Sequence, residues 1–197
     1  MGLALASGVL AQPAPELDLA KAPLLFERNQ EQVEPEVRYL ALGLSETVWT
    51  TGSEIVFGRE SGSISMRLVG AEDLRFEALK PHRHRTDYYQ GSDPKKWVLG
   101  VPSYSKIHAE EVYPGIALTL YGTADGALEY DFAVGPGANA DSIRLGFGGI
   151  ESVRIGERGD LLLDGPGGLR VHRAPIAFQL ADNRRTRVEA AFKIEDY

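Results

Sequence analysis

The sequence predicts an all-β protein, either an antiparallel β-sandwich or an open, barrel-like meander of many short strands and hairpins. Three observations support this class. Apolar and polar residues alternate with period two along much of the chain, turn-forming residues separate the alternating runs, and no stretch shows a capped apolar stripe at helical spacing. The 22 glycines and 11 prolines supply residues for many tight turns. Short strands joined in this way are typical of sandwiches and open barrels.

The clearest predicted strands form a hairpin in the second half of the chain. The run Leu128–Val134 places apolar side chains on one face and Glu129 and Asp131 on the other. The run Ile116–Leu120 precedes it, and a connection that ends in Asp-Gly joins the two. These two strands should be antiparallel neighbours.

Further alternating runs predict further strands. Turns are expected at 157–160 and 164–168, which gives the chain after residue 150 the pattern of a meander. The runs are Ile64–Leu68, Leu74–Ala78, Ile143–Phe147, Val153–Ile155, Leu161–Leu163, Leu169–Val171, Ile176–Phe178 and Val188–Ile194.

The chain divides into three segments. Residues 1–22 hold a short apolar run, Leu3–Ala11, and are expected to be the remnant of a signal peptide or a disordered tail. Residues 23–150 are the main β domain. Residues 151–197 are a β-hairpin continuation of that domain, and we expect it to be truncated at the C-terminus because alternation continues to Ile194.

Composition excludes several classes of partner and site. The formal net charge of −7 argues against nucleic acid and anionic membrane surfaces, because both require an excess of positive charge. There is no cysteine, so disulfides and zinc-thiolate sites are excluded. No segment predicts a membrane span.

A search for catalytic groups finds one pair of carboxylates. Glu129 and Asp131 lie on one strand face at a separation that paired-carboxylate glycosidases use, but a solvated face opposite basic residues is the alternative. No cysteine nucleophile, Gly-x-Ser-x-Gly turn or phosphate-binding loop occurs. We therefore expect no catalytic residue, no cofactor and no enzymatic activity.

Two patterns could suggest a metal, and neither is sufficient. His82 and His84 share one face of an extended segment, but the arginines beside them repel a cation, and the alternative is a basic surface loop. Asp125 and Asp160 lie in turns without the spaced oxygen ligands of a calcium loop. We expect no metal site. His172 is expected on a polar strand face.

An aromatic cluster is the remaining candidate site. Aromatic rings beside a carboxylate can stack on and hydrogen-bond a sugar or a peptide, whereas turn-flanked rings can also fill the core or a corner of a sandwich. The rings lie close in sequence to Asp93: Tyr88, Tyr89, Trp97, Tyr104 and Tyr113.

Five blocks of the sequence, in order, carry a family resemblance. They are Phe26–Gln32, Asp87–Trp97, Val112–Ile116, Leu128–Phe132 with Pro136–Ala138, and Pro175–Gln179. Together they resemble the uncharacterised N-terminal domain of bacterial surface proteins that carry seven-bladed β-propeller (SBBP) repeats. That family usually has Gly where Glu31 stands, which argues against a tight turn here, and Asn where Asp87 stands.

The resemblance implies a location and a partner. The protein would be secreted or on the cell surface, extracellular or periplasmic, and downstream β-propeller repeats of the same chain would be its neighbour, with a surface polysaccharide or protein as a further partner. Two function classes remain open. One is a non-catalytic structural or adhesive module. The other is a carbohydrate-binding or carbohydrate-processing domain that uses six candidate residues: Tyr88, Tyr89, Asp93, Trp97, Glu129 and Asp131.

Overall fold

The computed structural model of the chain describes residues 23–43, 46–71, 73–123, 126–181 and 184–195. The segment expected to be a signal remnant or tail, 1–22, lies outside these residues, as does Asp125. The all-β prediction is confirmed, since strands hold 55% of the residues and helices 4%. Every strand pair in the described part of the chain is antiparallel.

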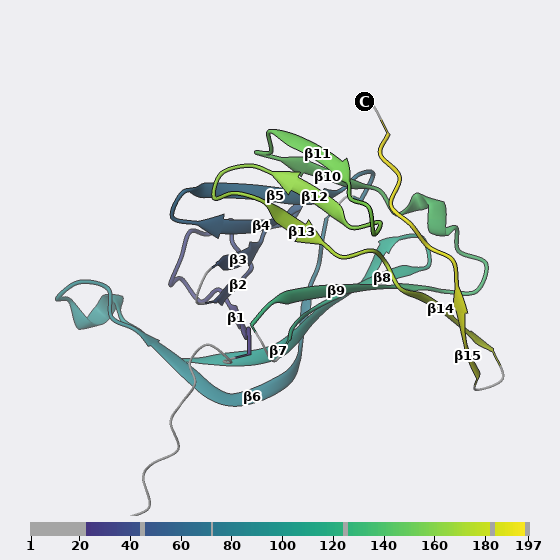
Figure 1. Cartoon of the computed structure of the whole chain (residues 1–197). Coiled ribbons are helices and arrows are strands. Elements are labelled where there is room, and N and C mark those ends of the chain that lie inside the picture. The colour runs from purple at the N-terminus through teal and green to yellow at the C-terminus, as the bar shows by residue number, and fades with distance from the viewer. Residues whose placement is uncertain (1–22, 44–45, 72, 124–125, 182–183, 196–197) are drawn as a thin grey trace, which may run out of the picture.

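Ten of the described strands form one sheet, which curls into a half-barrel (Figure 1). The path of neighbours across it is β10-β5-β4-β3-β2-β1-β7-β8-β9, and β6 pairs with β7. In chain order the strands are β1 (Phe26–Arg28), β2 (Tyr39–Leu42), β3 (Thr47–Thr50), β4 (Glu54–Arg59), β5 (Gly62–Leu68), β6 (Glu77–Tyr88), β7 (Val98–Tyr113), β8 (Ile116–Gly122), β9 (Leu128–Val134) and β10 (Leu145–Gly148).

The long strand β7 connects the two halves of this sheet. Near its middle Tyr104 pairs with Phe26 of β1, and from Lys106 onward it pairs with β8. The predicted hairpin of β8 and β9 is confirmed, with Ile116 opposite Val134 and Gly122 opposite Leu128. The core accordingly draws on both halves: fully buried side chains come from β1, β4, β5, β7 and β8, among them Phe26, Ile55, Met66, Ile107 and Leu118.

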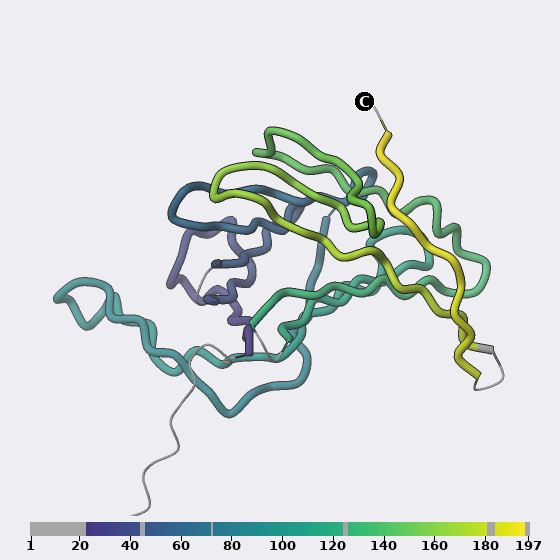
Figure 2. Tube along the Cα trace, viewed as in Figure 1, coloured from purple at the N-terminus to yellow at the C-terminus, as the bar shows by residue number. Residues whose placement is uncertain are grey.

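Two smaller sheets follow in the chain (Figure 2). Strands β11 (Ser152–Ile155), β12 (Leu161–Asp164) and β13 (Arg170–His172) form a meander, and Leu161 and Leu163 of β12 belong to the main core. Arg170 fixes the meander to the large sheet, because its buried guanidinium forms an ion pair with Glu46 and donates to the Phe57 carbonyl at 3.2 Å. Strands β14 (Ala177–Ala181) and β15 (Arg184–Val188) form a separate hairpin.

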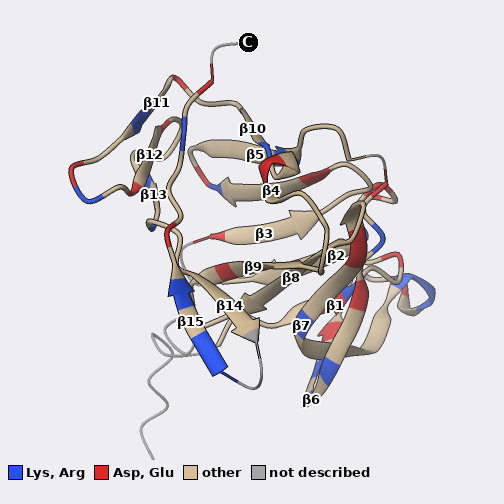
Figure 3. Ribbon diagram, turned by 90° about the vertical axis from the view of Figure 1, so that its right-hand side faces the viewer, with Lys and Arg blue, Asp and Glu red and all other residues tan. Residues whose placement is uncertain are grey.

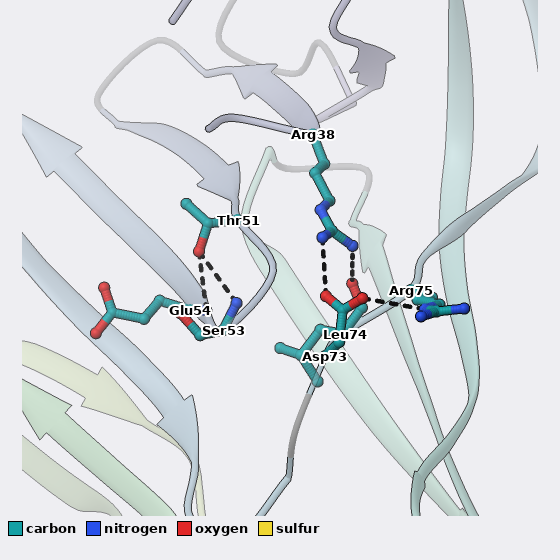
Figure 4. Close-up of polar contacts among 7 residues, drawn as sticks. All are labelled: Arg38, Thr51, Ser53, Glu54, Asp73, Leu74 and Arg75. Carbon is teal, nitrogen blue, oxygen red and sulfur yellow. Dashed lines mark hydrogen bonds and ion pairs between the residues drawn. The ribbon is translucent and has the colours of Figure 1, made fainter. Parts of the chain in front are cut away.

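The connection between β5 and β6 is fixed by a charged cluster (Figure 4). Arg38 pairs with Asp73 at 2.8 Å and donates to the Leu74 carbonyl at 3.1 Å, and Asp73 also pairs with Arg75 at 3.0 Å. The hydrogen bond from Arg75, followed by the charge of Arg38, holds the pKa of Asp73 below its usual value. The Leu74 amide donates to the Gly52 carbonyl at 2.7 Å, which is a loop contact and not a strand ladder. The strand predicted from Leu74 to Ala78 therefore starts only at Glu77.

The strand predicted from Val188 to Ile194 is also wrong. Strand β15 ends at Val188, and the chain then leaves the ladder and runs along the body of the domain (Figure 2). Phe192 packs against the main core, while Ile194 is 42% exposed. Of the alternating apolar residues only Phe192 is partly buried, whereas Val188, Ala190 and Ile194 are exposed, so the alternation does not mark a strand face on the core.

His172 does not lie on a polar face, as the sequence suggested. Its Nδ1 is 3.0 Å from the Tyr130 hydroxyl, and its ring meets Phe57 and Phe147 edge-on, with centroids 5.9 and 5.5 Å apart. Arg170, two residues earlier on the same strand, lies over the same Phe57 ring, so a charged neighbour in sequence does not indicate a solvated face here. The imidazole is half-buried among aromatic rings.

The turn after β1 forms in spite of Glu31. This residue adopts φ +76°, the left-handed conformation that favours glycine, so the expectation that Glu would prevent a tight turn is wrong. The Asn29 side chain holds the loop. Its Nδ2 donates to the Val37 carbonyl at 2.8 Å, and its Oδ1 accepts from the Glu31 backbone amide at 3.0 Å. The Asn side chain thereby replaces backbone partners that a regular strand would offer.

Among the described residues there is no helix of the length and apolar character needed to cross a bilayer.

Candidate functional site

The hairpin of β6 and β7 projects from the body of the domain (Figure 1). Of the predicted aromatic residues, Tyr88, Tyr89 and Trp97 lie at or next to its tip, whereas Tyr104 and Tyr113 lie further along β7. A short 3₁₀ helix, Pro94–Lys96, forms the tip. Asp93 caps it, since its side chain accepts from the Lys95 amide at 3.1 Å, and proline occupies the first helical turn. The indole nitrogen of Trp97 donates to the Gly91 carbonyl at 3.2 Å. These bonds fix the Trp97 ring on the projecting loop.

Tyr89 and Trp97 form a ring pair at this tip. Their centroids are 5.1 Å apart and their planes meet at 79°, an edge-to-face arrangement. Tyr89 is 63% exposed, and Leu99 next to it is 56% exposed. Asp87 supports the pair from below: one carboxylate oxygen accepts from the Gly100 amide at 2.7 Å, and the other accepts from the Tyr89 hydroxyl at 3.4 Å. The result is a fixed aromatic surface, exposed at Tyr89 and half-buried at Trp97, with a carboxylate beside it.

Tyr88 points to a different environment from Tyr89. Its hydroxyl donates to Glu27 at 2.5 Å, and the other Glu27 oxygen accepts from the Thr86 hydroxyl. Burial, followed by the hydrogen bond to Glu27, raises the pKa of Tyr88. Tyr88 is therefore an anchor of the hairpin. Of the other clustered rings, Tyr113 is buried and donates to the carbonyls of Val69 and Arg144, both at 3.1 Å.

Glu129 and Asp131 lie on another part of the molecule. Both are exposed on β9, and their cross-strand partners are Tyr121 and Thr119 of β8, not the basic residues expected opposite them. Burial, then hydrogen bonds to the two carboxylates, raise the pKa of Tyr121. Lys106 of β7 lies over the Tyr121 ring at 4.5 Å. Since Lys106 is separated from Trp97 by roughly 25 Å of strand, the structure does not bring the acidic pair and the ring pair together.

The groups considered for metal binding have other partners. His82 and His84 are exposed on β6, in strand rather than loop, and Nδ1 of His82 accepts from the His84 amide at 3.2 Å. Asp160 accepts from the Ala174 amide at 2.9 Å and from Arg173 at 3.2 Å. No cluster of three or more His, Asp or Glu side chains able to hold a metal occurs among the residues that the structure describes.

Comparison with known proteins places this architecture in a family. The model of a domain of unknown function, DUF7948, matches residues 26–197. The chain belongs to the DUF7948 family. No curated protein and no solved structure matches it.

In this DUF7948 domain, two of the sequence blocks that carry the resemblance meet in space. Glu27, from the block Phe26–Gln32, binds Tyr88, from the block Asp87–Trp97. The Gln90 side chain also donates to the Gln32 carbonyl at 2.9 Å. These contacts join the end of β6 next to the hairpin tip to the first strand of the DUF7948 domain and the turn after it.

Sequence reasoning missed Glu27 and the basic residues of β6. Glu27 is only 7% exposed, but it lies in a strand of three residues, too short to show a period. Strand β6 is exposed over most of its length and so shows no alternation either. The cationic residues between Lys80 and Arg85 were the available sequence signal for this surface, but they entered only as an argument against a metal site at His82 and His84.

Proposed function

We propose that this domain is a non-catalytic structural or adhesive module of a secreted or cell-surface bacterial protein, preceding propeller-type repeats in the same chain. In this proposal the domain makes its adhesive contact through the tip of the β6–β7 hairpin. The resemblance described above supports the location and the neighbouring repeats. The contact itself is argued from the structure of the tip.

The single observation that carries the proposal is the ring pair on a projecting hairpin, in which Tyr89 is exposed and Trp97 is half-buried (Figure 1). A large aromatic side chain left in solvent gives up the free energy of its burial, about 1.5–3 kcal/mol, unless a partner covers it. The hydrogen bond of the Trp97 indole and the Asp93 cap hold the tip in one conformation. Because the tip is already ordered, it loses little conformational entropy when a partner binds there.

A carbohydrate-processing role receives less support. Glycoside hydrolysis requires two carboxyl groups in different environments on either side of a bound sugar. Glu129 and Asp131 are instead side by side on one exposed strand with Tyr121 as a common hydrogen-bond partner, and the exposed rings are elsewhere. The arrangement favours binding over hydrolysis.

Retention on surface material tests the proposal. Purified domain would be applied to immobilised bacterial envelope fractions and to a polysaccharide array, with Tyr89→Ala and Trp97→Ala as variants. We expect both variants to keep the fold, measured by circular dichroism and thermal melting, and to lose most retention. Phe178→Ala is the matched control, because Phe178 is an exposed aromatic, at 41%, on the β14–β15 hairpin. Unchanged retention of folded Tyr89→Ala, or equal loss in Phe178→Ala, would contradict the proposal.

A further inference from the structure

The β6–β7 hairpin carries an excess of positive charge in an otherwise acidic chain. Five exposed cations follow its outer strand and its tip, and we call them the basic strip: Lys80, Arg83, Arg85, Lys95 and Lys96. Asp87 and Asp93 lie in the same stretch, so residues 80–96 carry +3 of a formal net charge of −7, and the remainder of the chain carries −10. None of the five forms an ion pair with another residue in the described part of the chain. The strip is therefore available to an anionic partner.

The backbone of β6 determines how such a partner is recognised. Among the strands that the structure describes, β6 pairs with β7 alone, which leaves its other edge without a described partner. However, Pro81 lacks an amide donor, Lys80 has φ +54°, and the pairing register with β7 shifts between Pro81 and Arg85. These features interrupt the edge where a partner strand would add, a common device against strand addition. Recognition along β6 must therefore use side chains.

The chemistry of these side chains fits a chain of sugars that carries carboxylate or sulfate groups. Guanidinium and ammonium groups form charge-assisted hydrogen bonds with such anions. The ring pair of Tyr89 and Trp97 on the same hairpin offers apolar faces on which sugar rings stack. A single-stranded nucleic acid would also meet cations and rings, and the acidic chain repels it as it repels any polyanion; the proposed adhesive role at the cell surface favours the polysaccharide.

We infer that the β6–β7 hairpin binds an anionic polysaccharide, whose acidic groups contact the basic strip and whose sugar rings contact Tyr89 and Trp97. The inference rests on the proposed adhesive function and adds the chemical class of the ligand. The hairpin is suited to an extended polymer, because the strip follows a long strand and no enclosed cavity is required. The tip and the strip then contribute in different ways: the rings through stacking, and the cations through a salt-dependent attraction.

Binding to defined polymers tests the inference. The probes are alginate as a polyuronate, dextran as a neutral polysaccharide and oligothymidylate as a nucleic acid, measured by affinity electrophoresis and calorimetry at low and at physiological salt. We expect binding to alginate that weakens as salt increases, and weaker binding to the other two probes. Tighter binding to oligothymidylate than to alginate, or equal binding to dextran, would overturn the inference.

Charge reversal identifies the surface. We expect Arg83→Glu/Arg85→Glu to weaken alginate binding about tenfold or more, a change that corresponds to loss of one or two good ionic contacts. The control is Arg184→Glu/Arg187→Glu on β15, which changes the net charge equally on the other projecting hairpin (Figure 3). Equal weakening in the control would mean a net-charge effect and would overturn the inference.

The Arg85 guanidinium donates to the Gly100 carbonyl at 3.1 Å, so its replacement could disturb the hairpin. A second charge-reversal variant therefore leaves β6 unchanged. Lys95→Glu/Lys96→Glu alters only exposed side chains of the tip and should weaken binding in the same direction. If the ring variants lose envelope retention while both charge-reversal variants keep it, the adhesive tip stands and the anionic ligand is wrong. If the ring variants keep retention as well, both proposals fail.

Discussion

The Tyr130 hydroxyl lies 3.0 Å from Nδ1 of His172, in a contact between strand β9 and strand β13. Aromatic rings of the large sheet surround the imidazole, so it has little access to water. Burial, together with the charge of nearby Arg170, lowers the pKa of His172 to about 4. The folded domain therefore accommodates the neutral imidazole.

Stability should fall in mild acid because of this histidine. In the unfolded chain the imidazole takes up a proton near pH 6.5, whereas the folded chain does so only near pH 4. The unfolded state thus binds more protons between these values. The stabilisation is complete above pH 6.5 and is lost as the pH falls towards 4, a decrease of about 3 kcal/mol. Urea unfolding across this range measures it. His172→Gln, which cannot titrate, should give a flatter dependence, and an identical slope would argue against a buried imidazole.

The contact of Glu27 with Tyr88 should stabilise the end of β6 next to the hairpin tip. Glu27→Ala removes the acceptor of two hydroxyl groups, and we expect a cost of about 2 kcal/mol, with about 1 kcal/mol for Tyr88→Phe. In the double variant the two costs should not add, because both changes remove the same hydrogen bond. Chemical denaturation of the four proteins completes the cycle. Strict additivity would mean that the two side chains do not interact.

The ion pair of Arg170 with Glu46 should be necessary for docking of the β11–β13 meander. Arg170 is 7% exposed, and Arg170→Met leaves the Glu46 carboxylate with Arg59, at 3.2 Å, as its remaining ion-pair partner in the described chain. We expect a loss of about 2–4 kcal/mol in the free energy of unfolding. The exposed Arg184→Met is the matched control and should change stability by less than about 0.5 kcal/mol. Similar values for the two variants would refute a structural role for the pair.

Glu31→Gly should stabilise the domain. The left-handed conformation at φ +76° costs a non-glycine residue about 1–2 kcal/mol, and the greater freedom of glycine in the unfolded chain offsets part of the gain. A net increase of about 0.5–1 kcal/mol is expected in thermal or chemical unfolding. Glu31→Ala keeps the conformational cost and should leave stability nearly unchanged. If the two substitutions act alike, the turn does not hold this residue in the left-handed region.

The fold class could be predicted from the sequence because most strands after residue 60 expose one face. Apolar and polar residues alternate along β8 and β9, and the short connection between the two strands sets their antiparallel pairing. Strands β2 and β4 were missed for a physical reason. Three consecutive residues of β2 and four of β4 are buried, so both faces are covered and no period remains.

The candidate site was predictable only in part. The sequence indicated a cluster of aromatic residues, but it could not separate Tyr88 from Tyr89, although they are neighbours. Successive residues of an extended chain point to opposite sides, so one hydroxyl reaches the buried Glu27 while the other ring stays in solvent. Which side is covered depends on β1, a strand distant in sequence, so the local sequence pattern cannot indicate it.

Strand β7 also has a consequence for how the domain unfolds. Its residues Ser103 and Tyr104 pair with β1, those from Lys106 onward pair with β8, and β6 lies along it as well, so neither half of the large sheet can come apart while the other keeps its full set of ladder bonds. Melting should therefore be a single cooperative transition, with the slowest amide hydrogen exchange in the middle of β7. The hairpin tip is tied to the same unit through the hydrogen bonds of Tyr88 with Glu27 and of Gln90 with Gln32, so we expect it to lose its order when β1 separates from β7.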